Sequence, residues 1–164
     1  MSGVCLPVGF ERVFASPLLR ARQTAQALGL KHPVLDDRLI EQHWGIWEGL
    51  TREEILSRHG ADAFIKAGLG TSFRPGGGES TSEMHARVAA FLKMVAAHEQ
   101  DAVAVTHLGV LRSAYTLATG WNMATPMPAE LDVSKILLLA LDGDGVPRIE
   151  GLNLAFTARK TGRA

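Results

Sequence analysis

The sequence has a single cysteine, no excess charge of either sign, and no long apolar run. Because Cys5 has no partner for an internal disulfide, we expect a reducing compartment, the cytoplasm. No basic segment followed by an apolar stretch marks secretion. The longest uninterrupted apolar run, Ile136–Leu141, is far shorter than the roughly 20 residues that cross a bilayer, which argues against a membrane protein.

The 17 basic and 17 acidic residues balance, so the chain lacks the long-range positive field that attracts nucleic acid. With 164 residues and 46% hydrophobic content, the chain has the size and composition of one globular domain, residues 1–164. A chain of this length buries roughly 70% of its unfolded surface, enough for a core without disulfides or structural metal.

Strand-like and helix-like segments alternate along the chain. The residues Glu11–Ala15 read as a strand, and we expect Ser16 to cap a helix with Pro17 at its first position. A continuous apolar run at Ala102–Thr106 predicts a second strand, and a helix ending at Gly120 follows His107.

Two capping boxes predict further helices, one from Arg52 and one after Ser80 with an apolar stripe over Met84–Val95. The run Lys135–Leu141 predicts a buried strand. We therefore expect an α/β fold with three layers, in which helices cover both faces of a mostly parallel sheet. In such sheets ligands bind at the carboxyl ends of strands, which singles out Ser16–Arg20 and His107.

Four segments carry recognisable motifs, in this order: SPLLRARQTA from Ser16, LIEQHWGIWEG from Leu39, PGGGES from Pro75 and VTHLGVLR from Val105. Together they resemble the signatures of the histidine phosphatase superfamily, also called phosphoglycerate mutase-like. The PGGGES segment has one glycine more than the family loop. Leu108 stands where the family usually has glycine.

The resemblance implies a role for each candidate residue. Arg20 and His107 would bind the phosphoryl group, since a guanidinium and an imidazole at strand ends can donate to its oxygens. Glu41 would give a proton to the leaving oxygen. Glu79, at a helix start, is a weaker candidate on the substrate side. No cofactor and no metal are implied, and no cluster of residues has metal-ligand spacing.

Members of this family begin with an apolar strand that ends in Arg-His-Gly, whose histidine is the nucleophile. No such segment precedes Glu11, so we expect a domain that is truncated at its N-terminus, with the first strand and first helix missing. The tripeptide Arg58-His59-Gly60 follows a helical pattern and is expected to end that helix. Loss of a central strand leaves unpaired strand edges, which predicts a homodimer or otherwise altered assembly.

The sequence thus predicts a phosphatase of small phosphomonoesters that is impaired or inactive as it stands. Its ligand would be a small phosphorylated metabolite or inorganic phosphate. The alternative is a catalytically dead phosphate-binding or interaction module. A third reading is that the given start omits part of an ordinary phosphatase.

Overall fold

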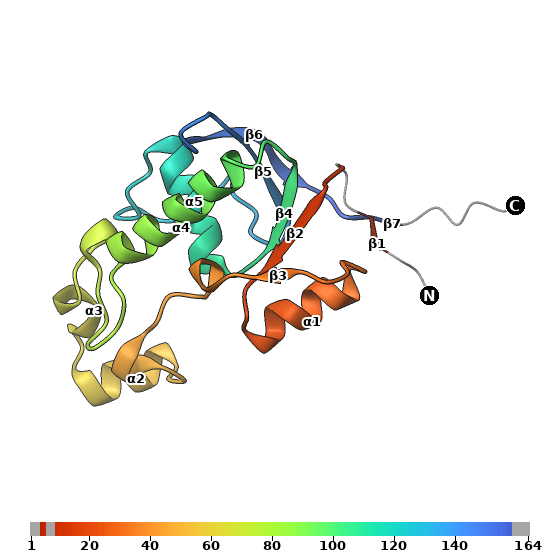
Figure 1. Cartoon of the computed structure of the whole chain (residues 1–164). Helices are drawn as coiled ribbons and strands as arrows, with labels where there is room; N and C mark the ends of the chain where they lie inside the picture. The colour runs from red at the N-terminus through yellow and green to blue at the C-terminus, as the bar shows by residue number, and fades with distance from the viewer. Residues whose placement is uncertain (1–3, 6–8, 159–164) are drawn as a thin grey trace, which may run out of the picture.

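The computed structural model describes residues 4–5 and 9–158. Its centre is a parallel sheet in the order β3-β2-β4, formed by β2 (Arg12–Ala15), β3 (Val34–Leu35) and β4 (Ala102–Val105). The helix α1 (Leu19–Ala27) covers one face of this sheet, and α4 (Thr81–Ala96) and α5 (Leu108–Thr119) cover the other (Figure 1). The predicted three-layer α/β architecture is confirmed.

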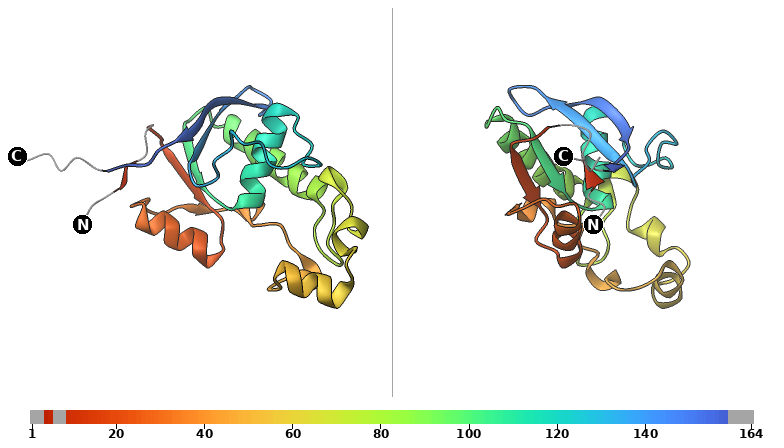
Figure 2. Two further views of the ribbon diagram at one scale, coloured as in Figure 1. Left: turned by 180° about the vertical axis from the view of Figure 1, so that it is seen from behind. Right: turned by 90° about the vertical axis from the view of Figure 1, so that its right-hand side faces the viewer.

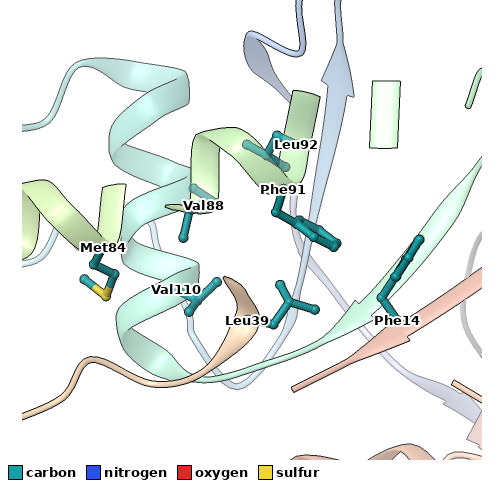
Figure 3. Packing of buried hydrophobic residues seen from close by; sticks show 8 residues of the cluster. Phe14, Leu39, Met84, Val88, Phe91, Leu92 and Val110 are labelled. Atoms are coloured by element: carbon teal, nitrogen blue, oxygen red, sulfur yellow. The ribbon is translucent and has the colours of Figure 1, made fainter. Parts of the chain in front are cut away.

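The main core lies between the sheet and the pair α4–α5 (Figure 3). Phe14 of β2 meets Phe91 of α4 edge to face, with ring centroids 5.3 Å apart. Such a pair adds about 0.5–1.5 kcal/mol beyond the area that it buries. The remaining core residues are Leu39, Met84, Val88, Leu92, Val110 and Ala114. The stripe predicted on α4 is therefore the face that packs on the sheet.

The opposite face of the sheet is packed with smaller side chains. Ala15 of β2 and Val105 of β4 contact Ala21 and Ala25 of α1, and Leu30 closes this cluster. Alanines at helical spacing let α1 lie close to the strands. This close packing fixes where the first turn of α1, and hence Arg20, lies relative to the sheet.

Both predicted capping boxes are present. Thr51 caps α2 (Arg52–His59) and Ser80 caps α4. At each helix the side chain of the cap residue accepts the N–H of the glutamate three residues later, and the side chain of that glutamate accepts the N–H of the cap residue. The helix α2 ends at Gly60, whose φ of 95° is unfavourable for a side chain. Arg58-His59-Gly60 is thus a helix end, as predicted.

Residues 44–73, which lie between β3 and α4 in the chain, form a smaller subdomain whose side chains pack around Trp47. Trp47, Ile55 and Ala63 form its buried cluster, with Trp44 packed against them. Its other elements are the 3-10 helices η2 (Gly45–Trp47) and η3 (Gly70–Ser72) and the short α3 (Ala63–Lys66). A third 3-10 helix, η1 (Asp37–Leu39), leads from β3 toward this subdomain.

The start of α1 differs from the sequence prediction. The helix begins at Leu19, its N-cap is Leu18, and no side chain caps it. Ser16 precedes the helix, and its hydroxyl contacts the His107 Nε2 at 2.8 Å while it also accepts the N–H of Leu18 at 3.3 Å. The helix therefore begins later than Ser16-Pro17 predicts, and Ser16 makes a tertiary contact in addition to a local turn.

The strand predicted at Lys135–Leu141 forms, but it is neither fully buried nor part of the parallel sheet. β5 (Ile136–Leu141) pairs only with β6 (Pro147–Leu154), antiparallel across the turn that begins at Asp142, and its side chains are half-buried. A separate antiparallel pair joins β1 (Val4–Cys5) to β7 (Thr157–Ala158). No helix in the described part of the chain is long and apolar enough to span a membrane.

Leu39 offers a test of the core, because its side chain is 1% exposed between the sheet and α4. Leu39→Ala should lower the free energy of unfolding by about 2–5 kcal/mol, the usual cost of removing a buried leucine. Leu19→Ala is the matched control, since Leu19 is 65% exposed, and it should change stability by about 0.5 kcal/mol or less. Urea denaturation measures both. Equal effects would contradict this description of the core.

Candidate functional site

The candidate site lies where β2 and β4 end side by side. Ala15 is in register with Val105, and the next N–H, that of Ser16, donates to the Val105 carbonyl at 2.9 Å. Ser16 is fully buried and His107 is 7% exposed. The Ser16 Oγ and the His107 Nε2 are 2.8 Å apart. Parallel pairing thus brings together two residues that are 91 positions apart in the chain.

Arg20, in the first turn of α1, contacts the other ring nitrogen of His107. Its Nε–H donates to the Nδ1 of His107 at 3.1 Å. A nitrogen that accepts from a guanidinium carries no proton of its own, so a neutral His107 holds its proton on Nε2 and donates it to Ser16. The ring is therefore fixed in orientation and tautomer from both sides.

The surroundings of His107 keep the imidazole neutral. Burial is the main cause that lowers its pKa, and the positive charges of Arg20 and Arg87 add to it, so that the pKa falls to about 4. At neutral pH the positive charge at this contact therefore comes from the guanidinium of Arg20 and not from His107. No carboxylate among the described residues lies within ion-pair distance of Arg20.

Glu41 lies against the start of α5. Its carboxylate accepts the N–H of Gly109 at 3.0 Å and that of Gln42 at 2.9 Å. The first N–H groups of a helix have no partner within the helix, so a carboxylate there is stabilised by the hydrogen bond and by the helix dipole. A Cβ at Gly109 would collide with the Glu41 carboxylate. Glycine at this position permits the close approach.

The segment that carries Glu41 is held by the glycine-rich loop at 75–79. The N–H of Ile46 donates to Gly76 at 3.0 Å, the N–H of Glu79 donates to His43 at 2.8 Å, and the side chain of Gln42 donates to the Glu79 carbonyl at 2.9 Å. Gly45 has a φ of 56°, and a side chain there would collide with the loop. Two of the four motifs thus act as one unit that positions Glu41.

In the part of the chain that the structure describes, no hydrogen bond or ion pair joins the Glu79 carboxylate to Arg20, Glu41 or His107. Its carboxylate binds the guanidinium of Arg87 in a two-pronged ion pair, at 2.6 and 2.8 Å. Arg87 also donates to the carbonyl of Arg38 at 2.7 Å. Glu79 therefore ties the glycine-rich loop to α4, and Arg87 contributes positive charge near His107.

Sequence reasoning gave no role to Arg87, to Arg112 or, beyond a helix cap, to Ser16. Glu79 precedes the N-cap of α4 and lies eight residues before Arg87, so the pair has no i,i+3 or i,i+4 spacing that would have indicated it. Arg112, on α5, stacks over Trp121 at 5.3 Å and has a buried Nε with no partner. Burial lowers its pKa and the nearby Glu41 opposes that change.

The donors of the site suit an anion. Guanidinium groups and the free N–H groups at helix starts donate hydrogen bonds, and they match phosphate or carboxylate geometry. Within the described ranges, no group of three or more His, Cys, Asp or Glu side chains is arranged to hold a metal ion.

The arrangement around His107 makes a prediction that NMR can check. Nitrogen-15 spectra should show His107 in the Nε2–H tautomer at neutral pH, with a titration near pH 4 instead of near 6.5. Arg20→Ala removes the donor to Nδ1 and should leave a mixture of tautomers, since the Ser16 hydroxyl can either accept from Nε2 or donate to it. A single unchanged tautomer in that variant would show that Arg20 does not fix the tautomer.

Comparisons with known proteins identify the family of this chain. The chain matches the family model of the histidine phosphatase superfamily, branch 1, over residues 5–155. It is 30% identical over 151 residues to the bifunctional protein Rv2228c of Mycobacterium tuberculosis, covering 88% of this chain and 41% of that protein. The chain therefore spans about two fifths of the length of the first curated relatives that it matches.

Solved structures show the same fold. YhfR of Bacillus stearothermophilus superposes with a TM-score of 0.75 at 26% identity, over 91% of this chain and 76% of that one. The mycobacterial glucosyl-3-phosphoglycerate phosphatase Rv2419c, in complex with inorganic phosphate, superposes with a TM-score of 0.71 at 24% identity, over 88% of this chain and 77% of that one. The four motifs, their meeting at the strand ends and the family match all agree, and the chain belongs to the histidine phosphatase superfamily, branch 1.

Proposed function

We propose that this chain binds the phosphoryl group of a small phosphomonoester, or inorganic phosphate, between Arg20 and His107. The observation that carries the proposal is the 3.1 Å contact between the Arg20 Nε and the His107 Nδ1. A guanidinium cation meets a neutral imidazole there, and no carboxylate among the described residues lies at ion-pair distance from the guanidinium. An anion would supply the missing negative charge and accept hydrogen bonds from both groups.

Binding would change the protonation of His107. When Arg20 turns its N–H groups to phosphate oxygens, the Nδ1 of His107 loses its donor and faces an anion. A nearby negative charge favours the protonated imidazole, so phosphate should raise the pKa of His107 from about 4. The imidazolium could then donate from Nδ1 to the phosphoryl oxygen. The NMR titration of His107 with and without phosphate follows this step.

The proposed reaction class is phosphomonoester hydrolysis, in line with the family. In that reaction Arg20 and His107 would stabilise the charge on the transferring group, and Glu41 would act in its protonated form, giving its proton to the leaving oxygen and becoming the carboxylate that the N–H groups of Gln42 and Gly109 stabilise. None of the three is placed as the nucleophile. Both ring nitrogens of His107 are engaged, with Ser16 and with Arg20. The 164 residues by themselves should therefore bind the ligand better than they turn it over.

A second candidate function is a phosphate-binding or interaction module without catalysis. The engaged His107 favours it, because binding needs only Arg20 and a donor at the helix start.

Phosphate or vanadate affinity tests the binding site. Arg20→Ala should weaken binding by about 1.5–3 kcal/mol, the range for a hydrogen bond to a charged group, which is roughly a 10- to 150-fold rise in Kd. Arg22→Ala is a matched control, since Arg22 is an exposed arginine two positions later on the same helix. Isothermal titration calorimetry measures both. Equal losses would show that only general positive charge matters.

Turnover of p-nitrophenyl phosphate between pH 5 and 8 tests the catalytic part. We expect little or none from the 164 residues, because no group is placed to attack phosphorus. Glu41→Ala and His107→Ala are the controls. Robust hydrolysis that both substitutions abolish would contradict this expectation, and it would mean that another residue serves as the nucleophile.

The sequence also predicts where the protein is located and how it assembles. Location in the cytoplasm stays a prediction that rests on the single cysteine. The homodimer also stays a prediction, and light scattering tests it. A monodisperse monomer would count against strand exchange between two copies.

A further inference from the structure

Leu108 places a large apolar side chain at the candidate site. It is the first residue of α5, directly after His107, and it is 46% exposed. A single exposed leucine is common on a protein surface and needs no explanation by itself. This leucine, however, lies between His107 and Gly109, which both belong to the site, and it stands where the family usually has glycine. The side chain is therefore a feature of this chain's own site.

The neighbouring Gly109 explains why the first turn of α5 carries its bulk at Leu108. A Cβ at Gly109 would collide with the Glu41 carboxylate and would lie 3.1 Å from the Sδ of Met84. Successive residues of an α-helix are about 100° apart around the axis. Leu108 therefore points away from that crowded side, in agreement with its exposure, and its side chain is free to contact a ligand.

The surface next to Leu108 is also largely apolar. Arg112 lies four residues later on the same side of α5, and long helical side chains extend back toward the preceding turn. The guanidinium of Arg112 stacks over Trp121 at 5.3 Å, and Trp121 meets Tyr115 edge to face at 6.1 Å. These contacts hold the loop after α5 beside the helix (Figure 2, left). Leu108, the stem of Arg112 and the indole of Trp121 together form what we call the α5 wall.

The proposed function determines where the alcohol part of a phosphomonoester lies. The phosphoryl group lies between Arg20 and His107, and the leaving oxygen lies near Glu41, whose carboxylate accepts the N–H of Gly109 at 3.0 Å. His107 and Gly109 are the two neighbours of Leu108 in the chain. The atoms attached to the leaving oxygen therefore lie next to the first turn of α5, where Leu108 is the large exposed side chain.

We propose that Leu108 contacts the alcohol part of the bound phosphomonoester, so that the site prefers an aryl or alkyl group over the hydroxylated part of a sugar phosphate. Burial of apolar surface against the α5 wall favours binding. Hydroxyl groups in the same place would lose hydrogen bonds to water without gaining partners from the leucine. Glycine at this position would offer neither effect. The inference rests on the proposed function, because it requires the phosphoryl group at Arg20 and His107.

Isothermal titration calorimetry with inorganic phosphate, phenyl phosphate and glucose 1-phosphate tests the proposal. Both esters attach a six-membered ring directly to the phosphate oxygen, and only one of the rings carries hydroxyl groups. The protein should bind phenyl phosphate about fivefold or more tightly than glucose 1-phosphate, as expected when part of one leucine is covered. Leu108→Ala should remove most of this preference and change the Kd of inorganic phosphate by about twofold or less, because phosphate has no alcohol part.

Two further variants serve as controls. Leu108→Met keeps an apolar side chain of similar volume and should keep the preference for phenyl phosphate. Val146→Ala truncates another exposed apolar residue, which is 58% exposed in the turn between β5 and β6, and should bind all three ligands as the unmodified protein does. Circular dichroism establishes that the three variants fold.

The outcomes separate this inference from the proposed function. Absence of phosphate binding to the unmodified protein would contradict the phosphate site itself and the inference with it. Phosphate binding with equal affinity for the two esters would overturn only the role of Leu108. Equal weakening of all three ligands by Leu108→Ala would also overturn it, since the residue would then shape the phosphate site. A dimer that Leu108→Ala splits into monomers would mean that a second copy covers this side chain instead of a ligand.

Discussion

The pairing of β2 with β4 is the constraint on which the candidate site depends. These two strands of four residues each set the register in which Ala15 lies beside Val105. The chain leaves both strands at the same level, and α1 and α5 begin there. Ser16, Arg20 and His107 meet because of this register. A shift by one residue would turn every side chain to the opposite face of the sheet and separate them.

Much of this arrangement follows from local signals in the sequence. The capping boxes at Thr51 and Ser80 place two helices, and the apolar run at Ala102–Thr106 places β4. Arg20, Glu41 and His107 were found through their motifs, and the structure brings Arg20 and His107 into contact. Each of these features depends on residues that are close together in the chain, so short patterns suffice to find them.

The features that sequence reasoning missed depend on distant partners. Ser16 has the chemistry of a helix cap, yet the helix begins later and the Ser16 hydroxyl contacts His107, which follows β4. The ion pair of Glu79 with Arg87 of α4 had no local pattern to indicate it. The run Lys135–Leu141 has the composition of a central strand, and it is half-buried because no strand among the described residues lies on its inner edge. The composition of a strand indicates that its side chains can be buried, but the neighbours of the strand in the folded sheet determine whether they are.

The main core also connects the two halves of the site. The hydroxyl of Thr106, which directly precedes His107, donates to the carbonyl of Leu39 at 2.8 Å. Leu39 lies two residues before Glu41, and its side chain is buried between the sheet and α4. This hydrogen bond joins the segment that carries His107 to the segment that carries Glu41. The packing of Leu39 therefore determines how firmly the two residues are held relative to each other.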